Sequence, residues 1–215
     1  MKKNILILLL VFLPVAAFAA DQNQERPHWT FEIKGGLFYP DIENWKDYYG
    51  NDRTTQYAAT LAYKLIRQIE FGIEGGYVID KGQGFAPLHN TMAGNVTYEL
   101  FPVNVFVLAR GVFSEKQWLV PYVGGGFTRM YYREKIEFQD TVKGHADGYH
   151  GRAGLQFLLD GLDPDAANSF YLEEGVYHTY FFIKAGYTRA MVNTTSGGSV
   201  NLGGTSYLVG LLFEF

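Results

Sequence analysis

Apolar and polar residues alternate with a period of two along most of this chain, most clearly at its C-terminal end. Because successive side chains of a strand point to opposite faces, the alternating residues there form one apolar stripe. The stripe consists of Tyr207, Val209, Leu211, Phe213 and Phe215. Alternation in seven earlier segments brings the expected number of antiparallel strands to eight. Their approximate ranges are residues 31–39, 55–65, 69–77, 95–112, 118–133, 149–159 and 177–191, followed by the last strand ending at Phe215.

The connections between these strands form a long set and a short set. Residues 40–54, 79–91, 134–148 and 192–204 are long and polar, and tight turns near Arg67 and Glu115 alternate with them. Transmembrane β-barrels combine short periplasmic turns with long extracellular loops. The pattern therefore predicts four long extracellular loops, with both ends of the mature chain in the periplasm.

Two features depart from this simple pattern. Residues 160–175 belong to the short set but are long, and Asp163 followed by Pro164 is typical of a helix N-cap and first helical residue. We therefore expect a short periplasmic helix between the sixth and seventh strands. Pro102 cannot donate a hydrogen bond to a β-ladder, so it predicts a bulge or a register change in the fourth strand.

The N-terminal segment indicates export. Lys2 and Lys3 precede an apolar run over residues 5–15, and Ala17-Phe18-Ala19 follows. This pattern is typical of a secretory signal peptide over residues 1–20, and the run is too short for a membrane-spanning helix of roughly 20 residues. We expect residues 21–215 to form a single domain.

Composition narrows the class of protein further. Loss of Lys2 and Lys3 with the signal peptide changes the formal net charge from -4 to -6, which argues against nucleic acid as a partner. The chain has no cysteine, so it forms neither disulfides nor a thiolate site. Aromatic residues make up 17% of the chain, and they favour membrane interfaces.

Alternation alone does not distinguish a membrane barrel from a lipocalin-like soluble barrel or a β-sandwich, because the apolar face can point at lipid or at a core. Four features together favour the membrane barrel. They are the signal peptide, the stripe ending in Phe215, the unequal connections, and strands of about 10 residues with aromatic ends.

On these features the chain resembles the small outer-membrane barrels represented by the transmembrane domain of outer membrane protein A and by outer membrane proteins X and W. Residues 121–126 also resemble the Pro-Tyr-x-Gly-x-Gly strand common in such barrels. The resemblance implies an all-β, eight-stranded, antiparallel up-and-down transmembrane β-barrel in the outer membrane of Gram-negative bacteria. It also implies that the C-terminal stripe is the assembly signal for the barrel-assembly machinery, and that outer-membrane lipid and lipopolysaccharide surround the protein.

Charged residues on the face opposite the apolar one are candidates for the interior. An eight-stranded barrel has a lumen just wide enough for side chains to fill, so we expect a closed polar lumen. The candidates carry both signs and are expected to pair rather than to line an ion or solute path. They are Glu32, Lys34, Lys64, Glu70, Glu74, Arg110, Arg152, Lys184 and Glu214.

The histidines and acidic residues do not form a recognisable catalytic or metal-binding pattern. We expect His28 before the first strand, His89 and His145 in loops, and His150 near the outer surface. Thr179 follows His178, so the His-x-Ser motif of the lipid A deacylases is absent. The spacing of the acidic side chains between positions 160 and 175 does not match an EF-hand calcium-binding loop. We therefore expect no catalytic residue, no metal and no cofactor.

Three classes of function remain open. The first is a non-enzymatic barrel that serves envelope integrity or surface interaction through its long loops. The second is passage or binding of small hydrophobic molecules, and the third is a lipid A-modifying enzyme. Candidate surface contacts for lipopolysaccharide or an unknown partner are Trp45, Tyr48, Tyr49 and Phe85.

Overall fold

The computed structural model describes residues 27–86, 91–114, 117–137, 140–193 and 198–215, and within these ranges eight long strands form the fold. The expected signal peptide and His89 lie outside the described residues. A ninth, short strand, β8 (Ser199–Asn201), pairs only with β7. The long strands are β1 (Trp29–Pro40), β2 (Thr54–Ile66), β3 (Ile69–Ala86), β4 (Thr91–Arg110), β5 (Leu119–Ile136), β6 (Val142–Leu158), β7 (His178–Asn193) and β9 (Gly204–Glu214).

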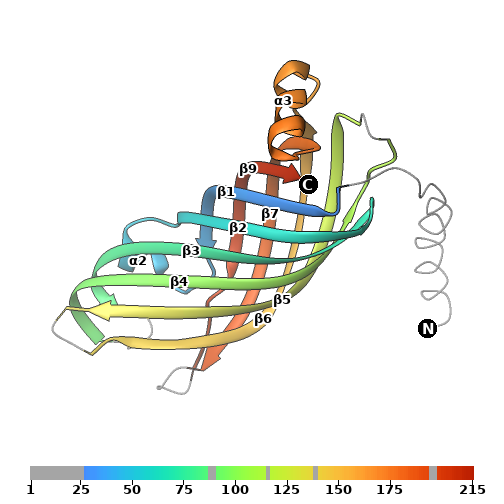
Figure 1. The fold of residues 1–215 in the computed structure, drawn as a ribbon. Coiled ribbons are helices and arrows are strands. Elements are labelled where there is room, and N and C mark those ends of the chain that lie inside the picture. The colour runs from blue at the N-terminus through green and yellow to red at the C-terminus, as the bar shows by residue number, and fades with distance from the viewer. Residues whose placement is uncertain (1–26, 87–90, 115–116, 138–139, 194–197) are drawn as a thin grey trace, which may run out of the picture.

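The sheet closes on itself into a barrel (Figure 1). All neighbouring strands are antiparallel, and β6 pairs with β7, while β1 pairs with β9 at the two ends of the chain. Closure gives every long strand a partner on both sides within the barrel, while the distal extensions of β3 beyond Ile79 and of β6 before Gly148 pair on one side. The predicted eight-stranded antiparallel barrel is confirmed.

The orientation of the two faces separates a membrane barrel from a soluble one. On β2, Leu65 is 58% exposed while the adjacent Lys64 is 6% exposed. The same inversion recurs around the barrel, with apolar side chains outside and charged side chains inside. A soluble barrel would bury the apolar face, whereas lipid around the outer face favours this arrangement.

Aromatic side chains on the outer face form two rings, one at each border of an aliphatic band. We call the end of the barrel where β1 begins and β9 finishes the terminal end, and the opposite end the distal end. The terminal ring contains Trp29, Tyr63, Phe71, Phe157, Phe181 and Phe215. The distal ring contains Tyr57, Tyr77, Phe101, Phe127, Tyr149, Tyr187 and Tyr207. Such paired rings mark the two interfaces of a membrane-spanning barrel.

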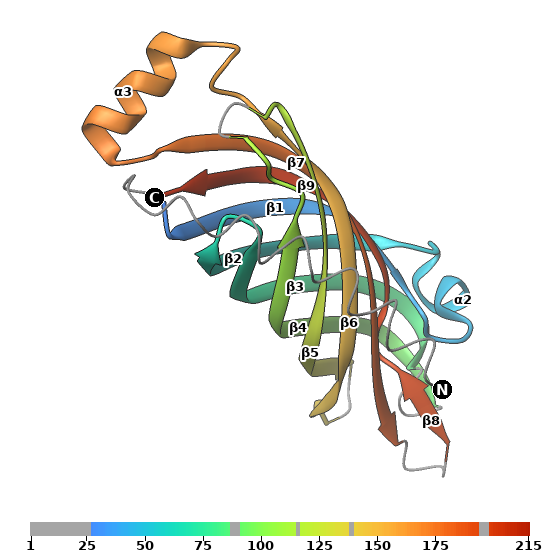
Figure 2. The ribbon, with the colours of Figure 1, turned by 90° about the vertical axis from the view of Figure 1, so that its right-hand side faces the viewer.

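A helix lies at each end of the barrel (Figure 2). At the terminal end, α3 (Pro164–Glu174) connects β6 to β7, which confirms the helix predicted between these strands. The Asp163 carboxylate caps it by accepting from the Ala166 N–H at 3.0 Å, and Gly175 ends it with a φ of 70°. At the distal end, the short helix α2 (Trp45–Tyr49) lies in the β1–β2 connection. Neither helix has the length and apolar character needed to cross a membrane.

Two of the four predicted long loops are mostly strand, so this expectation was wrong. β3 and β4 stay paired up to Ala86 and Thr91, and β5 and β6 up to Glu134 and Val142. Both faces of these extensions carry polar residues, so the apolar alternation that identifies a membrane strand fades although the ladder continues. As a result, β3 to β6 form a wall of 17 to 20 residues per strand, against 11 to 13 in β1, β2 and β9.

The bulge or register change predicted at Pro102 does not occur. The β4 register is unchanged on either side of Pro102 with both neighbouring strands, and the β3–β4 shift lies instead between Gln83 and Gly84. Gly76 faces the proline, and a Cβ there would lie 2.8 Å from the Pro102 ring. The missing side chain of Gly76 therefore makes room for the ring, and the β3–β4 ladder, which has no pair at Gly76 and Tyr77, resumes in the same register at Val78.

Candidate functional site

Buried polar side chains fill the lumen in two tiers. The tier nearer the terminal end is built around Glu214 of β9, whose Oε1 lies 2.5 Å from Lys64 Nζ and 2.6 Å from Arg110 Nη1. Arg110 Nε donates to Gln156 Oε1 at 3.0 Å, and Glu70 Oε2 lies 3.8 Å from Arg110 Nη1. The tier thus links β2, β3, β4, β6 and β9 across the interior.

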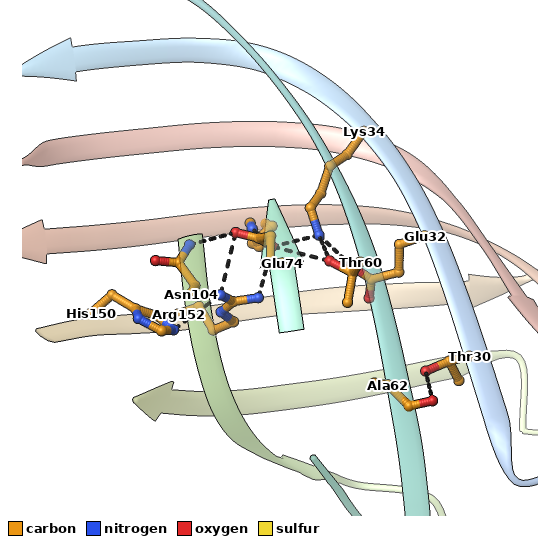
Figure 3. A network of polar contacts seen from close by, with 10 residues as sticks. Thr30, Glu32, Lys34, Thr60, Ala62, Glu74, Asn104, His150 and Arg152 are labelled. Carbon is orange, nitrogen blue, oxygen red and sulfur yellow. Dashed lines mark hydrogen bonds and ion pairs between the residues drawn. The ribbon is translucent and has the colours of Figure 1, made fainter. Parts of the chain in front are cut away.

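The central tier is built around Glu74 of β3 (Figure 3). Its Oε2 lies 2.6 Å from Lys34 Nζ, 2.9 Å from Arg152 Nη1 and 2.8 Å from Lys184 Nζ. Its Oε1 accepts from Asn104 Nδ2 at 2.9 Å. One carboxylate therefore holds three cations from three different strands.

Two further contacts complete the central tier. The Lys34 ammonium also lies 2.5 Å from Glu32 Oε2 and donates to the Thr60 hydroxyl (Figure 3). The Thr128 hydroxyl donates to Asn104 Oδ1, which fixes the amide that holds Glu74.

The structure brings all nine charged candidates into the lumen, where none is more than 6% exposed. Five are cations and four are carboxylates, so the formal charge of the set is +1. A buried charge separated from its partner costs about 3–5 kcal/mol, so these side chains have a strong reason to stay together. The candidates were chosen by charge, so they did not include the uncharged members of the two tiers, although parity along the strands also places these on the inner face. The uncharged members are Thr60, Asn104, Thr128 and Gln156.

His150 lies in the lumen, and it does not begin the sixth strand as expected. The residue is in the middle of β6, is 6% exposed, and has Nε2 3.0 Å from Arg152 Nη2. β6 begins earlier than the alternation indicated, and this places His150 one inward position above Arg152. Beside the two side chains lies a cavity of about 20 Å³, enough for one water-sized molecule.

An apolar layer lies on the distal side of the central tier, so the lumen is not polar along its whole length. It contains Phe38, Ile42, Trp45, Tyr49, Val78, Tyr98, Leu100, Met130, Ala146, Ala190 and Leu202. The α2 segment supplies Trp45 and Tyr49, whose rings stack with centroids 4.0 Å apart. Trp45 also meets the Tyr98 ring edge-on at 5.3 Å.

The burial of Trp45 and Tyr49 corrects their expected role as surface contacts. They are 3% and 6% exposed, because the β1–β2 connection folds into the distal mouth of the barrel. The side chains of Tyr48 and Phe85 lie outside the part of the chain that the structure describes. We call the layer together with α2 the distal plug.

The distal plug contains buried polar atoms without hydrogen-bond partners. They include Trp45 Nε1, Tyr49 OH and Tyr98 OH. Burial, and next the Glu134 carboxylate, raise the pKa of Tyr49, so its hydroxyl stays protonated. Each unpaired buried group costs about 1–3 kcal/mol, which offsets part of the stabilisation from ring packing.

The described histidines do not form a nucleophile–base pair. His28 Nδ1 lies 3.3 Å from the Lys64 carbonyl oxygen, and His178 Nδ1 lies 2.7 Å from Asp160 Oδ2. His145, expected in a loop, lies on β6 because that strand is longer than predicted. Among the described residues, none of these rings is hydrogen-bonded to a Ser or Thr hydroxyl, and no group of acidic, His or Cys side chains is arranged to hold a metal ion.

The C-terminal stripe lies on the outer face of β9. Tyr207, Val209, Leu211 and Phe215 are 36% to 55% exposed, and Phe213 lies on the same face. The stripe is in register with the outward residues of β1 and β7, as the pairs Ile33↔Leu211 and Ile183↔Val209 show. It therefore continues the apolar band of the barrel to the last residue.

An apolar outer band between two aromatic rings, closed around a charged interior, defines a transmembrane β-barrel. The chain matches the family described as "Outer membrane protein beta-barrel domain" over residues 5–215, and it belongs to this family. The protein is thus an outer-membrane barrel of the Gram-negative envelope, and the predicted resemblance to small eight-stranded outer-membrane barrels is confirmed. No curated protein matches the chain.

Two solved structures show the same fold at low sequence identity. Neisserial surface protein A (NspA) is 10% identical with a TM-score of 0.57, and the match covers 89% of this chain and 100% of that one. The N-terminal β-barrel domain of Pseudomonas aeruginosa OprF is 13% identical with a TM-score of 0.51, again covering 89% and 100%. Identity at this level supports the shared fold and carries no statement on activity.

Proposed function

We propose that this protein is a non-enzymatic outer-membrane barrel with a closed lumen, serving envelope integrity or surface interaction through its distal end. The single observation that carries the proposal is the central tier around Glu74. It joins strands on opposite sides of the barrel through contacts of 2.6 to 2.9 Å. The distal plug closes the same interior a second time.

The terminal end faces the periplasm in this proposal, and residues 1–20 are a cleaved signal peptide. The support is the asymmetry of the barrel, because β3 to β6 rise well beyond the distal ring, while at the terminal end β2 and β3 are joined by a tight turn. Transmembrane barrels place their short turns in the periplasm. The distal end then stands among lipopolysaccharide, and the barrel-assembly machinery reads the C-terminal stripe during insertion.

Conductance in a planar bilayer tests the closed lumen. We expect the purified, refolded barrel to give no steady single-channel current, because both the central tier and the distal plug would have to open at once. Heat-dependent mobility in dodecyl sulfate must show on the same sample that the barrel is folded. Steady conductance of a folded barrel would replace this proposal with a transport role.

A second candidate, binding of small hydrophobic molecules, is favoured by one observation. The distal plug is an apolar layer at the mouth of the barrel, and ligand pockets are mostly apolar. The chain has three tryptophans, so replacing Trp29 and Trp118 with Phe leaves Trp45 as the sole reporter inside this layer. Quenching of Trp45 by a brominated fatty acid, but not by bromide ion, would support this candidate.

The lipid A-modifying enzyme is the third class, and overexpression tests it. We expect the mass spectrum of lipid A to stay unchanged when the protein accumulates in the outer membrane. A defined mass loss or gain of one acyl chain would contradict the non-enzymatic role.

A further inference from the structure

The outer face of the β3–β6 wall changes from apolar to basic above the distal ring. On β5, the outward residues after Phe127 include Arg129, Arg133 and Lys135. On β6 and β7, the outward residues beyond the aromatic ring include Lys143 and Arg189. We call Arg129, Arg133, Lys135, Lys143 and Arg189 the basic face.

Strand register collects these side chains into one surface. Arg133 of β5 lies opposite Lys143 of β6, and Arg189 of β7 lies opposite Tyr149 in the distal ring. Two cations placed directly opposite one another on a sheet repel each other. The pair Arg133 and Lys143 therefore concentrates positive charge, which the Glu99 carboxylate of β4 beside Arg133 reduces in part.

The basic face has more cations than neighbouring carboxylates. Arg129 donates to both carboxylate oxygens of Asp147, from Nε at 2.6 Å and from Nη2 at 2.8 Å. Glu99 Oε2 is shared by Arg133 Nε at 2.5 Å and Lys135 Nζ at 3.7 Å. Five cations thus face two carboxylates, a surplus of three positive charges, in a chain whose formal net charge is -4.

Two further acidic residues lie near the basic face, and in the described part of the chain neither forms an ion pair with one of its five cations. Glu137 lies beyond the end of β5 and uses its Oε2 to accept from the Asn95 N–H at 2.9 Å. Asp140 lies in the β5–β6 connection. Among the described residues, neither Lys143 nor Arg189 has a carboxylate partner.

The position of the basic face indicates which anion it meets. An aromatic ring marks the border of the hydrocarbon core, so side chains just above it lie among lipid headgroups. Arginine binds phosphate through two parallel hydrogen bonds, and lysine adds a compact positive charge. Phosphate-bearing headgroups of the surrounding lipid are therefore the natural ligand class.

The height of the basic face distinguishes between two sources of such phosphate. Six residues separate Arg129 from Lys135, about 20 Å along the strand and about 14 Å along the membrane normal for a tilt of about 45°. The headgroup layer of a phospholipid leaflet is only about 5–8 Å thick. A lipid with phosphate groups at several heights above the membrane can contact the whole basic face. The phosphate of a phospholipid can contact only the cations nearest the distal ring.

The opposite side of the barrel lacks this feature. The residues following the distal ring on β2 and β9 are the uncharged Thr55 and Thr205, and both strands end there. We propose that the basic face is a one-sided binding site for the phosphate groups of lipopolysaccharide. The inference rests on the proposed orientation, in which the distal end faces outward.

The test is a titration of the full barrel, purified in detergent, with lipopolysaccharide, followed by native mass spectrometry. The key variant is Lys143→Gln with Arg189→Gln, which removes the two cations without a carboxylate partner. Loss of two cations near an anionic lipid surface should weaken binding roughly tenfold to thirtyfold at low salt. The matched control is Lys46→Gln with Arg53→Gln, which removes two exposed cations from the β1–β2 connection and should leave the affinity unchanged.

Two competitors identify the ligand. Dephosphorylated lipopolysaccharide and phosphatidylglycerol should each bind more weakly than intact lipopolysaccharide to the unaltered barrel. The inference would be overturned if either competitor bound as tightly as intact lipopolysaccharide. It would also be overturned if the control variant weakened binding as much as the key variant. The titration uses barrels in detergent, so its result does not depend on the orientation of the protein in the membrane or on whether the lumen is closed. Labelling of cells tests the orientation, and bilayer conductance tests the lumen. Heat-dependent mobility in dodecyl sulfate confirms that each variant is folded.

Discussion

Glu74 of β3 and Lys184 of β7 meet at 2.8 Å in the lumen, although their strands lie on opposite sides of the barrel. Four steps from strand to strand separate β3 from β7 in either direction around the ring. Because this contact spans the interior, it links the two halves of the sheet by a route that does not depend on the ladder.

The first prediction concerns Glu74→Gln. The change leaves Lys34, Arg152 and Lys184 around a neutral amide, and removal of one partner from a buried charge network costs about 3–5 kcal/mol. We expect a lower unfolding temperature in dodecyl sulfate, measured by the change in gel mobility, with export unaffected because the lipid face is the same.

Glu99→Gln is the matched control for this prediction. Glu99 also holds two cations, but the Arg133 side chain is 42% exposed, and exposed ion pairs contribute about 0–1 kcal/mol. The unfolding temperature should therefore change little. Equal shifts in the two variants would show that burial of the Glu74 network does not determine its contribution.

Periodicity was enough to predict the barrel and the inward position of the charged residues. The period of two assigns every strand residue to a face, so Glu32, Lys34 and Lys64 could be placed inside without any knowledge of their partners. The partners could not be predicted, because Glu74 meets Lys184 from strands more than 100 residues apart in the sequence. Such contacts depend on closure and register.

The same rule failed where the environment changes along a strand. Above the distal ring, the outer face of β5 and β6 carries charged residues, so the apolar alternation is lost and residues 134–148 were interpreted as a loop although the ladder continues. The distal plug was missed for a related reason. Trp45 and Tyr49 lie in a connection, where no periodicity indicates whether an aromatic ring points outward or folds back into the lumen.

The second prediction separates ring packing from polar burial in the distal plug. Trp45→Ala removes a ring that packs against Tyr49 and Tyr98, and truncation of a buried aromatic costs about 3–5 kcal/mol. Tyr49→Phe keeps the ring and removes a hydroxyl without a partner, so it should be neutral or stabilising by about 1 kcal/mol. Urea unfolding followed by circular dichroism measures both, and comparable destabilisation in the two variants would mean that the hydroxyl is hydrogen-bonded after all.

The third prediction concerns orientation and uses the absence of cysteine from the chain. Asn51→Cys places a thiol in the β1–β2 connection at the distal end, and Asn168→Cys places one on exposed α3 at the terminal end. A membrane-impermeant maleimide should label the first variant in intact cells and the second only after the outer membrane is permeabilised. The opposite pattern would invert the proposed topology and move the basic face to the periplasmic leaflet.

The last prediction tests whether the C-terminal stripe is an assembly signal as well as part of the apolar band. Phe215 is 40% exposed, and its backbone exchanges hydrogen bonds with Trp29 at 2.8 and 3.0 Å, which Phe215→Ala leaves intact. Phe181 is the matched control, because it is an outward aromatic of the same terminal ring and is 38% exposed. If the two rings acted only through contact with lipid, the two alanine variants would lose similar amounts of stability and assemble equally well. We expect both to refold in detergent, and only Phe215→Ala to lose outer-membrane yield severalfold in cells, measured on heat-modifiable protein. Equal yields would remove the assembly role and leave Phe215 as one more residue of the apolar band.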